Sequence, residues 1–157
     1  VRDKGMTPAG THVPIMPEEC LLHLGLTGGP GTLPPATVVD CTLGYGGHAE
    51  RTLRRLSDLG TGRLVAFDRD PIELARTESR LRRLLADPAG EVALETVPRN
   101  FSEAASALRD RNSGPATSLL ADLGLSSMQI DDDARGFTYK REGPLDMRMD
   151  AGRETAE

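Results

Sequence analysis

The sequence predicts a doubly wound α/β fold with a parallel sheet, and two observations lead to this prediction. Three short apolar segments are each followed by a segment of helical periodicity, and a fourth apolar segment comes after them. Strands that alternate with helices form parallel sheets with right-handed crossovers. The second observation is that Gly and Asp residues lie at or just after the ends of the first, second and fourth apolar segments, where doubly wound folds bind their ligands.

The composition is that of one ordinary domain. The chain has 157 residues, of which 38% are hydrophobic and 27% charged. We see no apolar run of about 20 residues and no secretory signal pattern, so we expect a soluble cytoplasmic protein without a membrane partner. A mitochondrial or other organellar location stays open, because the N-terminus is too ambiguous to show a transit peptide. Cys20 and Cys41 lack CxxC spacing, so neither a metal site nor a disulfide is expected.

Local signals place each element in chain order. An amphipathic helix is predicted over residues 17–26, with Pro17 near its start. The strands are expected over residues 37–41, 63–68, 91–97 and 117–123. The helices between them are expected over residues 48–59, 71–85 and 101–109. In the second of these helices, Asp70 is a suitable N-cap and Pro71 occupies the first helical position.

The charge pattern argues against nucleic-acid binding by overall electrostatics. The formal net charge is −5, whereas that mode of binding requires a basic surface. Two clusters of arginines fall within predicted helices, and a solvated helix face is favoured over an RNA-binding patch. The clusters are Arg51, Arg54 and Arg55, and Arg76, Arg80, Arg82 and Arg83.

A glycine-rich turn follows the first predicted strand. Gly44, Gly46 and Gly47 allow the backbone to approach a ligand closely, and the helix that follows offers free N–H groups. The stretch also satisfies a GxGxxA dinucleotide pattern, so the glycines alone do not separate a dinucleotide from S-adenosylmethionine. A purely structural tight turn is the other interpretation.

Three further residues are candidates for ligand contact. Asp68 ends the second predicted strand, where an acidic side chain accepts hydrogen bonds from ribose hydroxyls. His48 lies in the glycine-rich turn and either touches the ligand or is structural. Phe101 follows the third strand and either packs against an adenine ring or belongs to the core.

The fourth strand leads into a polar segment without periodicity. Asp122 ends this strand and is followed by Gly124, Ser126, Ser127 and Gln129, a cluster suited to holding an acceptor base. The aspartates at residues 131–133 are interpreted as a solvated run. A long segment of this kind inside a compact domain is usually functional or disordered.

Several of these stretches together resemble a known family. HVPIM at 12–16, DCTLGYGGH at 40–48, AFDRDP at 66–71, NFS at 100–102 and DLGLSSMQIDDDARGFTYKREGPLDMRMD at 122–150 are similar to successive motifs of the MraW-like ribosomal RNA small subunit (cytosine-N4)-methyltransferases and their mitochondrial counterpart. The resemblance runs from about His12 to Asp150, and its last stretch is highly specific.

The resemblance implies a Rossmann-like class I methyltransferase fold that uses S-adenosylmethionine to methylate N4 of a cytidine in small-subunit ribosomal RNA. The expected partner is this RNA or the assembling small subunit. The implied cofactor contacts are Gly46, Gly47, His48, Asp68, Phe101, Asp122 and Gln129. Asp122 is the catalytic candidate, because an acceptor for the N4–H hydrogen bond would localise the amine lone pair. A nearby backbone carbonyl is the alternative acceptor.

Members of that family are longer than this chain, and they carry an RNA-binding insertion and further strands. The sequence therefore predicts a truncated fold whose last strand has a bare apolar edge. Expected parts are a disordered N-terminus at residues 1–11, a cofactor domain at 12–123, and at 124–157 the start of the RNA-side insertion. A cofactor-binding remnant without activity and a nicotinamide-dependent oxidoreductase are the competing hypotheses.

Overall fold

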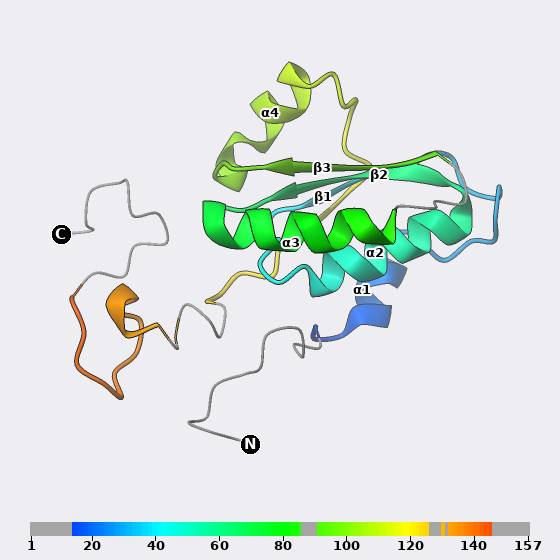
Figure 1. Cartoon of the computed structure of the whole chain (residues 1–157). Coiled ribbons are helices and arrows are strands. Elements are labelled where there is room, and N and C mark those ends of the chain that lie inside the picture. The colour runs from blue at the N-terminus through cyan, green and yellow to red at the C-terminus, as the bar shows by residue number, and fades with distance from the viewer. Residues whose placement is uncertain (1–13, 86–90, 126–129, 131, 146–157) are drawn as a thin grey trace. The chain divides into compact units, whose positions relative to one another are not determined.

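The computed structural model describes residues 14–85, 91–125, 130 and 132–145 (Figure 1). The chain divides into two compact units. Val13–Asp122 forms the larger unit, and Val1–His12 together with Leu123–Glu157 forms the smaller one. The expectation of a disordered N-terminus at residues 1–11 lies outside the described residues.

The larger unit is built on a four-stranded parallel sheet, as the sequence predicts. Its strands are β1 (Thr37–Asp40), β2 (Thr61–Phe67), β3 (Glu91–Val97) and β4 (Ser118–Leu120). They lie in the order β3-β2-β1-β4, and every neighbouring pair is parallel. The doubly wound, Rossmann-like arrangement is therefore confirmed.

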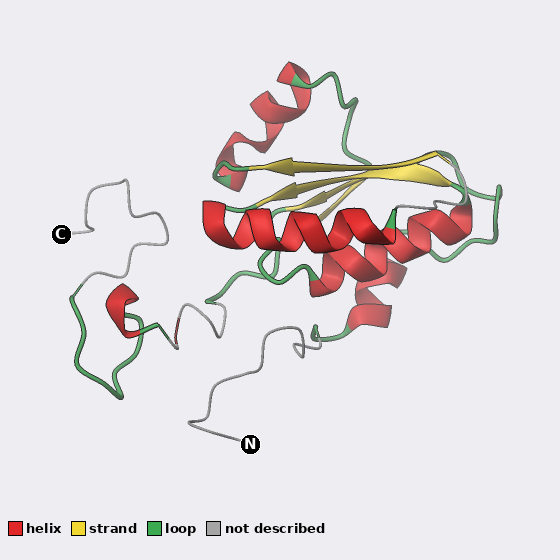
Figure 2. Cartoon of the chain, in the orientation of Figure 1, coloured by secondary structure: helices red, strands yellow, loops and turns green. Residues whose placement is uncertain are grey.

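Helices cover both faces of this sheet (Figure 2). On one face lie α2 (Gly47–Leu59) and α3 (Pro71–Leu84), and α1 (Pro17–His23) packs against α2. On the other face lies α4 (Ala104–Asp110), preceded by the 3₁₀ turn Phe101–Glu103. The sheet is thus buried on both sides where these helices cover it, which is the usual condition of a parallel sheet.

Alternation along the strands divides the core into two clusters. Val38 and Leu64 point toward the face of α2 and α3, where they pack with leucines such as Leu53 and Leu56. Val39, Val65, Phe67 and Val97 point to the opposite face and pack with Ala107 of α4. All of these side chains are buried. The two central strands are therefore anchored from both sides.

The outer edge of β4 is the exception to this burial. Within the described residues β4 pairs only with β1, and Leu119 is 58% exposed. In the part of the chain that the structure describes, the last strand therefore has the exposed apolar edge that the sequence predicts.

Several predicted boundaries shift for local reasons. The first helix ends at His23 instead of residue 26, because Gly25 adopts a φ of 74° and the N–H of Leu26 turns back to the carbonyl of Leu21. The predicted helix at 101–109 is split, because the Asn100 side chain accepts a hydrogen bond from the N–H of Ser102 and caps a 3₁₀ turn.

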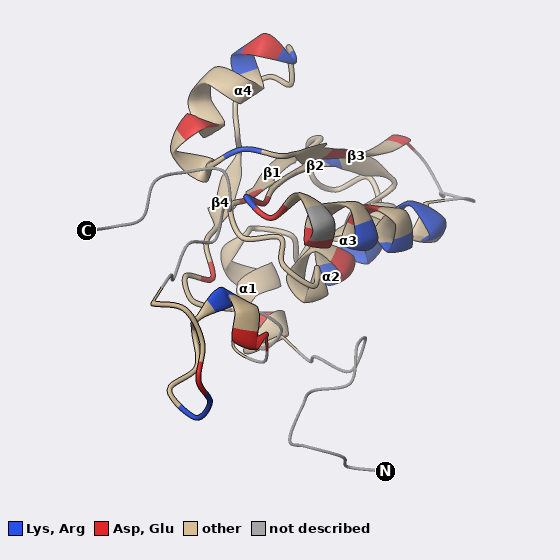
Figure 3. Cartoon of the chain, turned by 60° about the vertical axis from the view of Figure 1, so that its left-hand side comes forward, with Lys and Arg blue, Asp and Glu red and all other residues tan. Residues whose placement is uncertain are grey.

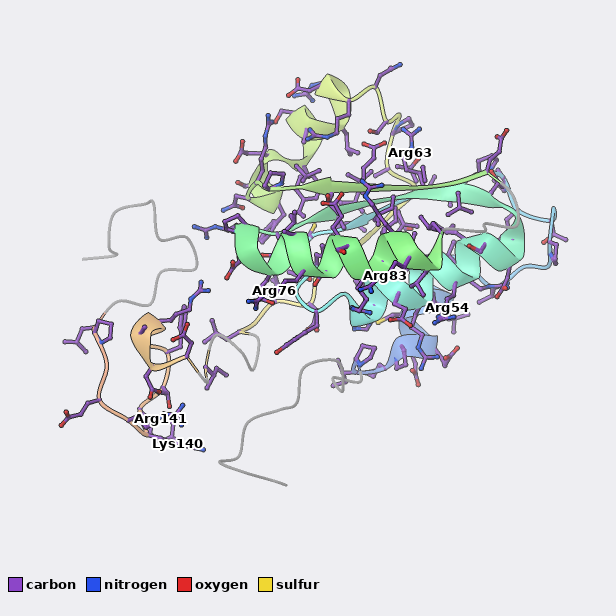
Figure 4. All side chains as sticks on the ribbon, viewed as in Figure 1. Arg54, Arg63, Arg76, Arg83, Lys140 and Arg141 are labelled. Carbon is purple, nitrogen blue, oxygen red and sulfur yellow. The ribbon has the colours of Figure 1, made fainter. Side chains whose placement is uncertain are left out.

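The arginine clusters form ion pairs with neighbouring carboxylates, and Figure 3 shows both signs of charge interspersed on α2 and α3. Arg54 pairs with Glu50 at 3.0 Å, and Arg82 pairs with Glu78 at 2.7 Å. Arg54, Arg76 and Arg83 project from these two helices in Figure 4. Because most of these cations are exposed and paired, the structure supports the prediction of a solvated helix face.

The described part of the smaller unit contains the 3₁₀ turn Asp133–Arg135, which Gly136 ends with a φ of 69°. The Arg141 side chain, labelled in Figure 4, bonds the Asp133 carboxylate. Arg135 also lies over the ring of Phe137, at 6.0 Å from its centroid. These contacts give the segment local order.

Candidate functional site

The carboxyl ends of the strands define the candidate site. From β1 the chain continues to β2 and then to β3, which both lie on one side of β1. The strand β4 lies on the other side of β1. The gap between β1 and β4 is therefore the topological switch point, where doubly wound sheets bind their ligands. Asp40 ends β1, while Asp68 and Asp122 follow the ends of β2 and β4.

The glycine-rich turn connects β1 to α2 and has a backbone that favours glycine. Gly44 and Gly46 have φ values of 46° and 68°. A Cβ on Gly46 would lie 2.6 Å from Cγ2 of Thr77, so this position also excludes a side chain on steric grounds. Gly47 then begins α2, and His48 is half-buried in the first turn of that helix.

Two side chains of α3 hold the turn in this conformation. The Thr77 hydroxyl donates a 2.7 Å hydrogen bond to the Gly44 carbonyl, and the Arg80 guanidinium donates one to the Tyr45 carbonyl. Arg80 is itself fixed by a 2.6 Å ion pair with Glu50 of α2. With its carbonyls held by α3, the turn is preorganised.

Asp68 ties the end of β2 to the same turn. Its Oδ2 accepts a 2.8 Å hydrogen bond from the N–H of Gly44, and its Oδ1 accepts a 2.9 Å bond from the N–H of Asp70. Burial raises the pKa of Asp68, and these two hydrogen bonds partly oppose that rise. A carboxylate has about four acceptor positions, so each oxygen retains capacity for a ligand hydroxyl.

Asp70 has the role that the sequence predicts. Its Oδ1 accepts a 3.3 Å hydrogen bond from the N–H of Glu73, and the side chain is buried at the start of α3. This is the contact of an N-cap residue, so the assignment of no ligand to Asp70 is consistent with the structure.

Asp40, Thr42 and Asp122 form a connected group across the switch point. Asp40 is buried, and its Oδ1 accepts a 2.9 Å hydrogen bond from the N–H of Thr42. The Thr42 hydroxyl accepts a 2.8 Å bond from the N–H of Asp122. Burial, reinforced by the charges of Asp68 and Asp122, raises the pKa of Asp40 to about 6.

The predicted site residues also differ in exposure and in whether the structure describes them. Asp122 is exposed beyond the end of β4. Phe101 begins the 3₁₀ turn after β3 and is 40% exposed, so its interpretation as a core residue is wrong. Gln129, Ser126 and Ser127 lie outside the described residues. Within the described part of the chain, no group of three or more His, Cys, Asp or Glu side chains is arranged to hold a metal ion, and no helix could cross a membrane.

Sequence reasoning missed the residues that support the turn from behind. Thr77 has a detectable signal, because its spacing from Leu74 and Leu81 places it on the buried face of α3. Arg80 has no comparable signal, since its side chain resembles its charged neighbours until the tertiary contacts are known. Thr42 lies within the stretch 40–48 that carries part of the family resemblance, but only the structure shows its bond to Asp122.

Comparison with known proteins agrees with this architecture. The family model described as the MraW methylase family matches residues 9–157. A protein of Alkaliphilus metalliredigens named ribosomal RNA small subunit methyltransferase H 2 is 45% identical over 153 residues, which are 98% of this chain and 40% of that protein. The ribosomal RNA small subunit methyltransferase H of Rubrobacter xylanophilus is 46% identical over 144 residues, 92% of this chain and 41% of that protein.

This chain thus spans about 40% of the length of these relatives. The glycine-rich turn, Asp68 and Asp122 all fall inside the matched residues. The chain belongs to the MraW methylase family.

Proposed function

We propose that this chain provides the S-adenosylmethionine site of an enzyme that methylates N4 of a cytidine in small-subunit ribosomal RNA. The observation that carries the proposal is the bond between Asp68 and the glycine-rich turn at the carboxyl edge of the sheet. The relatives named ribosomal RNA small subunit methyltransferase support the class of reaction and of substrate.

The residues present fit a nucleoside cofactor. Asp68 would accept hydrogen bonds from the two ribose hydroxyls, using the acceptor positions that Gly44 and Asp70 leave open. Gly46 and Gly47 admit close approach of the ligand, and His48 stands beside them in the first turn of α2. Phe101 offers an exposed aromatic surface for the adenine, and Gln129 completes the proposed set.

When bound, S-adenosylmethionine supplies a sulfonium methyl group, which departs from sulfur without the bonding electrons. The acceptor amine is a poor nucleophile, because its lone pair is delocalised into the pyrimidine ring. The exposed Asp122 carboxylate would accept a hydrogen bond from N4–H, localise that lone pair and receive the proton that the amine loses. We assign residues 124–157 to the start of the RNA-binding insertion.

Calorimetric titration tests the cofactor assignment directly. We expect S-adenosylmethionine to bind the purified chain and NAD not to bind. Binding of NAD alone would overturn the proposal in favour of an oxidoreductase. No binding of either ligand by a chain with a cooperative unfolding transition would also contradict it.

Methyl transfer tests the reaction. Small-subunit particles are incubated with the chain and a methyl-labelled donor, and the RNA is digested to nucleosides for mass spectrometry. We expect label in N4-methylcytidine. Cofactor binding without any transfer would instead identify a binding module, and label in another nucleoside would contradict the N4 assignment.

A further inference from the structure

Thr42 connects the ends of two strands that are far apart in the sequence. The last backbone bond between β1 and β4 runs from the N–H of Cys41 to the carbonyl of Leu120, at 2.9 Å. One residue further along, the Thr42 hydroxyl accepts the 2.8 Å bond from the N–H of Asp122. A side chain therefore continues the pairing of β1 with β4 beyond the backbone ladder.

Asp40 holds the backbone of the residue that carries this hydroxyl. Its buried carboxyl accepts a 2.9 Å bond from the N–H of Thr42. A hydroxyl oxygen has two acceptor positions, so the Thr42 hydroxyl can accept the bond from the N–H of Asp122. Serine retains this acceptor, whereas valine has nearly the same shape and lacks it.

We propose that Thr42 is a positioning residue. It holds the backbone at Asp122 and thereby fixes the position of Asp122 at the switch point between β1 and β4. The proposal rests on the proposed function, because Asp122 is the residue that would contact cofactor and acceptor amine. Asp122 is exposed and follows a strand of three residues, so little else in the described structure fixes its backbone.

The same pair of strands offers a matched control at its other end. The Thr117 hydroxyl donates a 3.1 Å bond to the carbonyl of Thr37, at the amino ends of β4 and β1. Thr117 and Thr42 therefore both bridge these strands through a hydroxyl, but only Thr42 lies at the carboxyl edge. Substitution of either threonine should lower the stability of the protein. Only substitution of Thr42 should also disturb the position of Asp122.

The test compares Thr42→Val, Thr42→Ser and Thr117→Val in the full 157-residue chain. Calorimetry gives the dissociation constant for S-adenosylmethionine, and thermal unfolding gives the stability. We expect Thr42→Val to weaken binding about tenfold, the usual effect of losing one hydrogen bond, and the other two variants to stay within about twofold. Equal weakening in Thr117→Val, or no weakening in Thr42→Val, would overturn the proposal.

The amide signal of Asp122 provides a readout that needs no ligand. In ¹H–¹⁵N NMR spectra we expect this signal to shift and lose protection from hydrogen exchange in Thr42→Val, and to recover in Thr42→Ser. An unchanged signal in Thr42→Val overturns the proposal. A wild-type chain that fails to bind S-adenosylmethionine overturns the proposed function instead, and the amide signal then decides alone whether Thr42 holds Asp122.

Discussion

Asp68 accepts a 2.8 Å hydrogen bond from the N–H of Gly44, across 24 residues of sequence. The glycine-rich turn is therefore joined directly to the carboxyl end of β2. Thr77 and Arg80 hold the same turn from α3. The first two predictions below rest on this arrangement.

Asp68→Asn should weaken the binding of S-adenosylmethionine by about 10- to 100-fold, because charge-assisted hydrogen bonds are lost and the new NH₂ group faces a backbone donor. Calorimetry measures the change. Asp58→Asn is the control, since Asp58 is an exposed carboxylate in the last turn of α2, just before β2 begins and not at the carboxyl ends of the strands. Unchanged affinity in Asp68→Asn would remove this residue from the site.

Gly46→Ala should destabilise the protein more than Gly60→Ala. Both glycines flank α2 with a positive φ, 68° and 84°, so both substitutions introduce backbone strain. Only Gly46 is also crowded, by Cγ2 of Thr77, whereas a Cβ on Gly60 meets nothing within 4 Å. We expect a difference of about 1–3 kcal/mol in the free energy of unfolding, measured in urea. Equal losses would show that the turn adjusts to the new methyl group.

Asp40→Asn should stabilise the protein at neutral pH. Burial raises the pKa of Asp40 to about 6 from its ordinary 3.8, so the folded state binds the proton more tightly than the unfolded state. Asp40 therefore lowers the free energy of unfolding as pH rises from about 4 to about 6. The Asn variant should be more stable than wild type by about 2–3 kcal/mol at pH 7, with the gain shrinking toward pH 4.

Urea unfolding of both proteins at several pH values measures this difference. The Asn side chain can still accept the bond from the N–H of Thr42, so the variant keeps this contact while it removes the charge. A gain that grows as the pH falls would contradict the assignment. Asp58→Asn controls for general effects of removing an exposed carboxylate.

Leu119→Lys should reduce aggregation without unfolding the protein. Leu119 is 58% exposed on the outer strand β4, and an apolar strand edge favours pairing with another chain. Leu22→Lys is the matched control, because Leu22 is 56% exposed but lies on α1. Light scattering at rising protein concentration should fall more for Leu119→Lys. An equal reduction would point to general solubility and not to the strand edge.

The sequence predicts the elements best where local pattern and tertiary burial agree. The third strand is predicted at residues 91–97 and observed as Glu91–Val97, because its limits coincide with clear changes in residue type. The fourth strand is predicted at 117–123 but observed as Ser118–Leu120, since backbone pairing and not apolar character sets its length.

The residues of the candidate site also differ in how well the sequence predicts them. Candidate residues near the carboxyl end of a strand, such as Asp68 and Asp122, can be located from their position in the sequence alone, and their contact with a ligand stays a prediction. Residues that act through another side chain cannot be located in this way, and Arg80 is the clearest case. Its contacts with Glu50 and the Tyr45 carbonyl cross 30 and 35 residues of sequence, so they depend on the packing of α3 against α2.

The shortness of β4 has a consequence for how the site forms. Three residues pair β4 with β1, at a separation of 80 residues, whereas β2 and β3 pair along seven positions. The free energy needed to open a segment grows with the contacts it makes, so β4 should detach from the sheet before the other strands do. Each detachment carries Asp122 away from Thr42, and the apparent affinity for a ligand falls in proportion to the time spent open. Warming should therefore weaken the site well below the temperature at which the rest of the sheet unfolds.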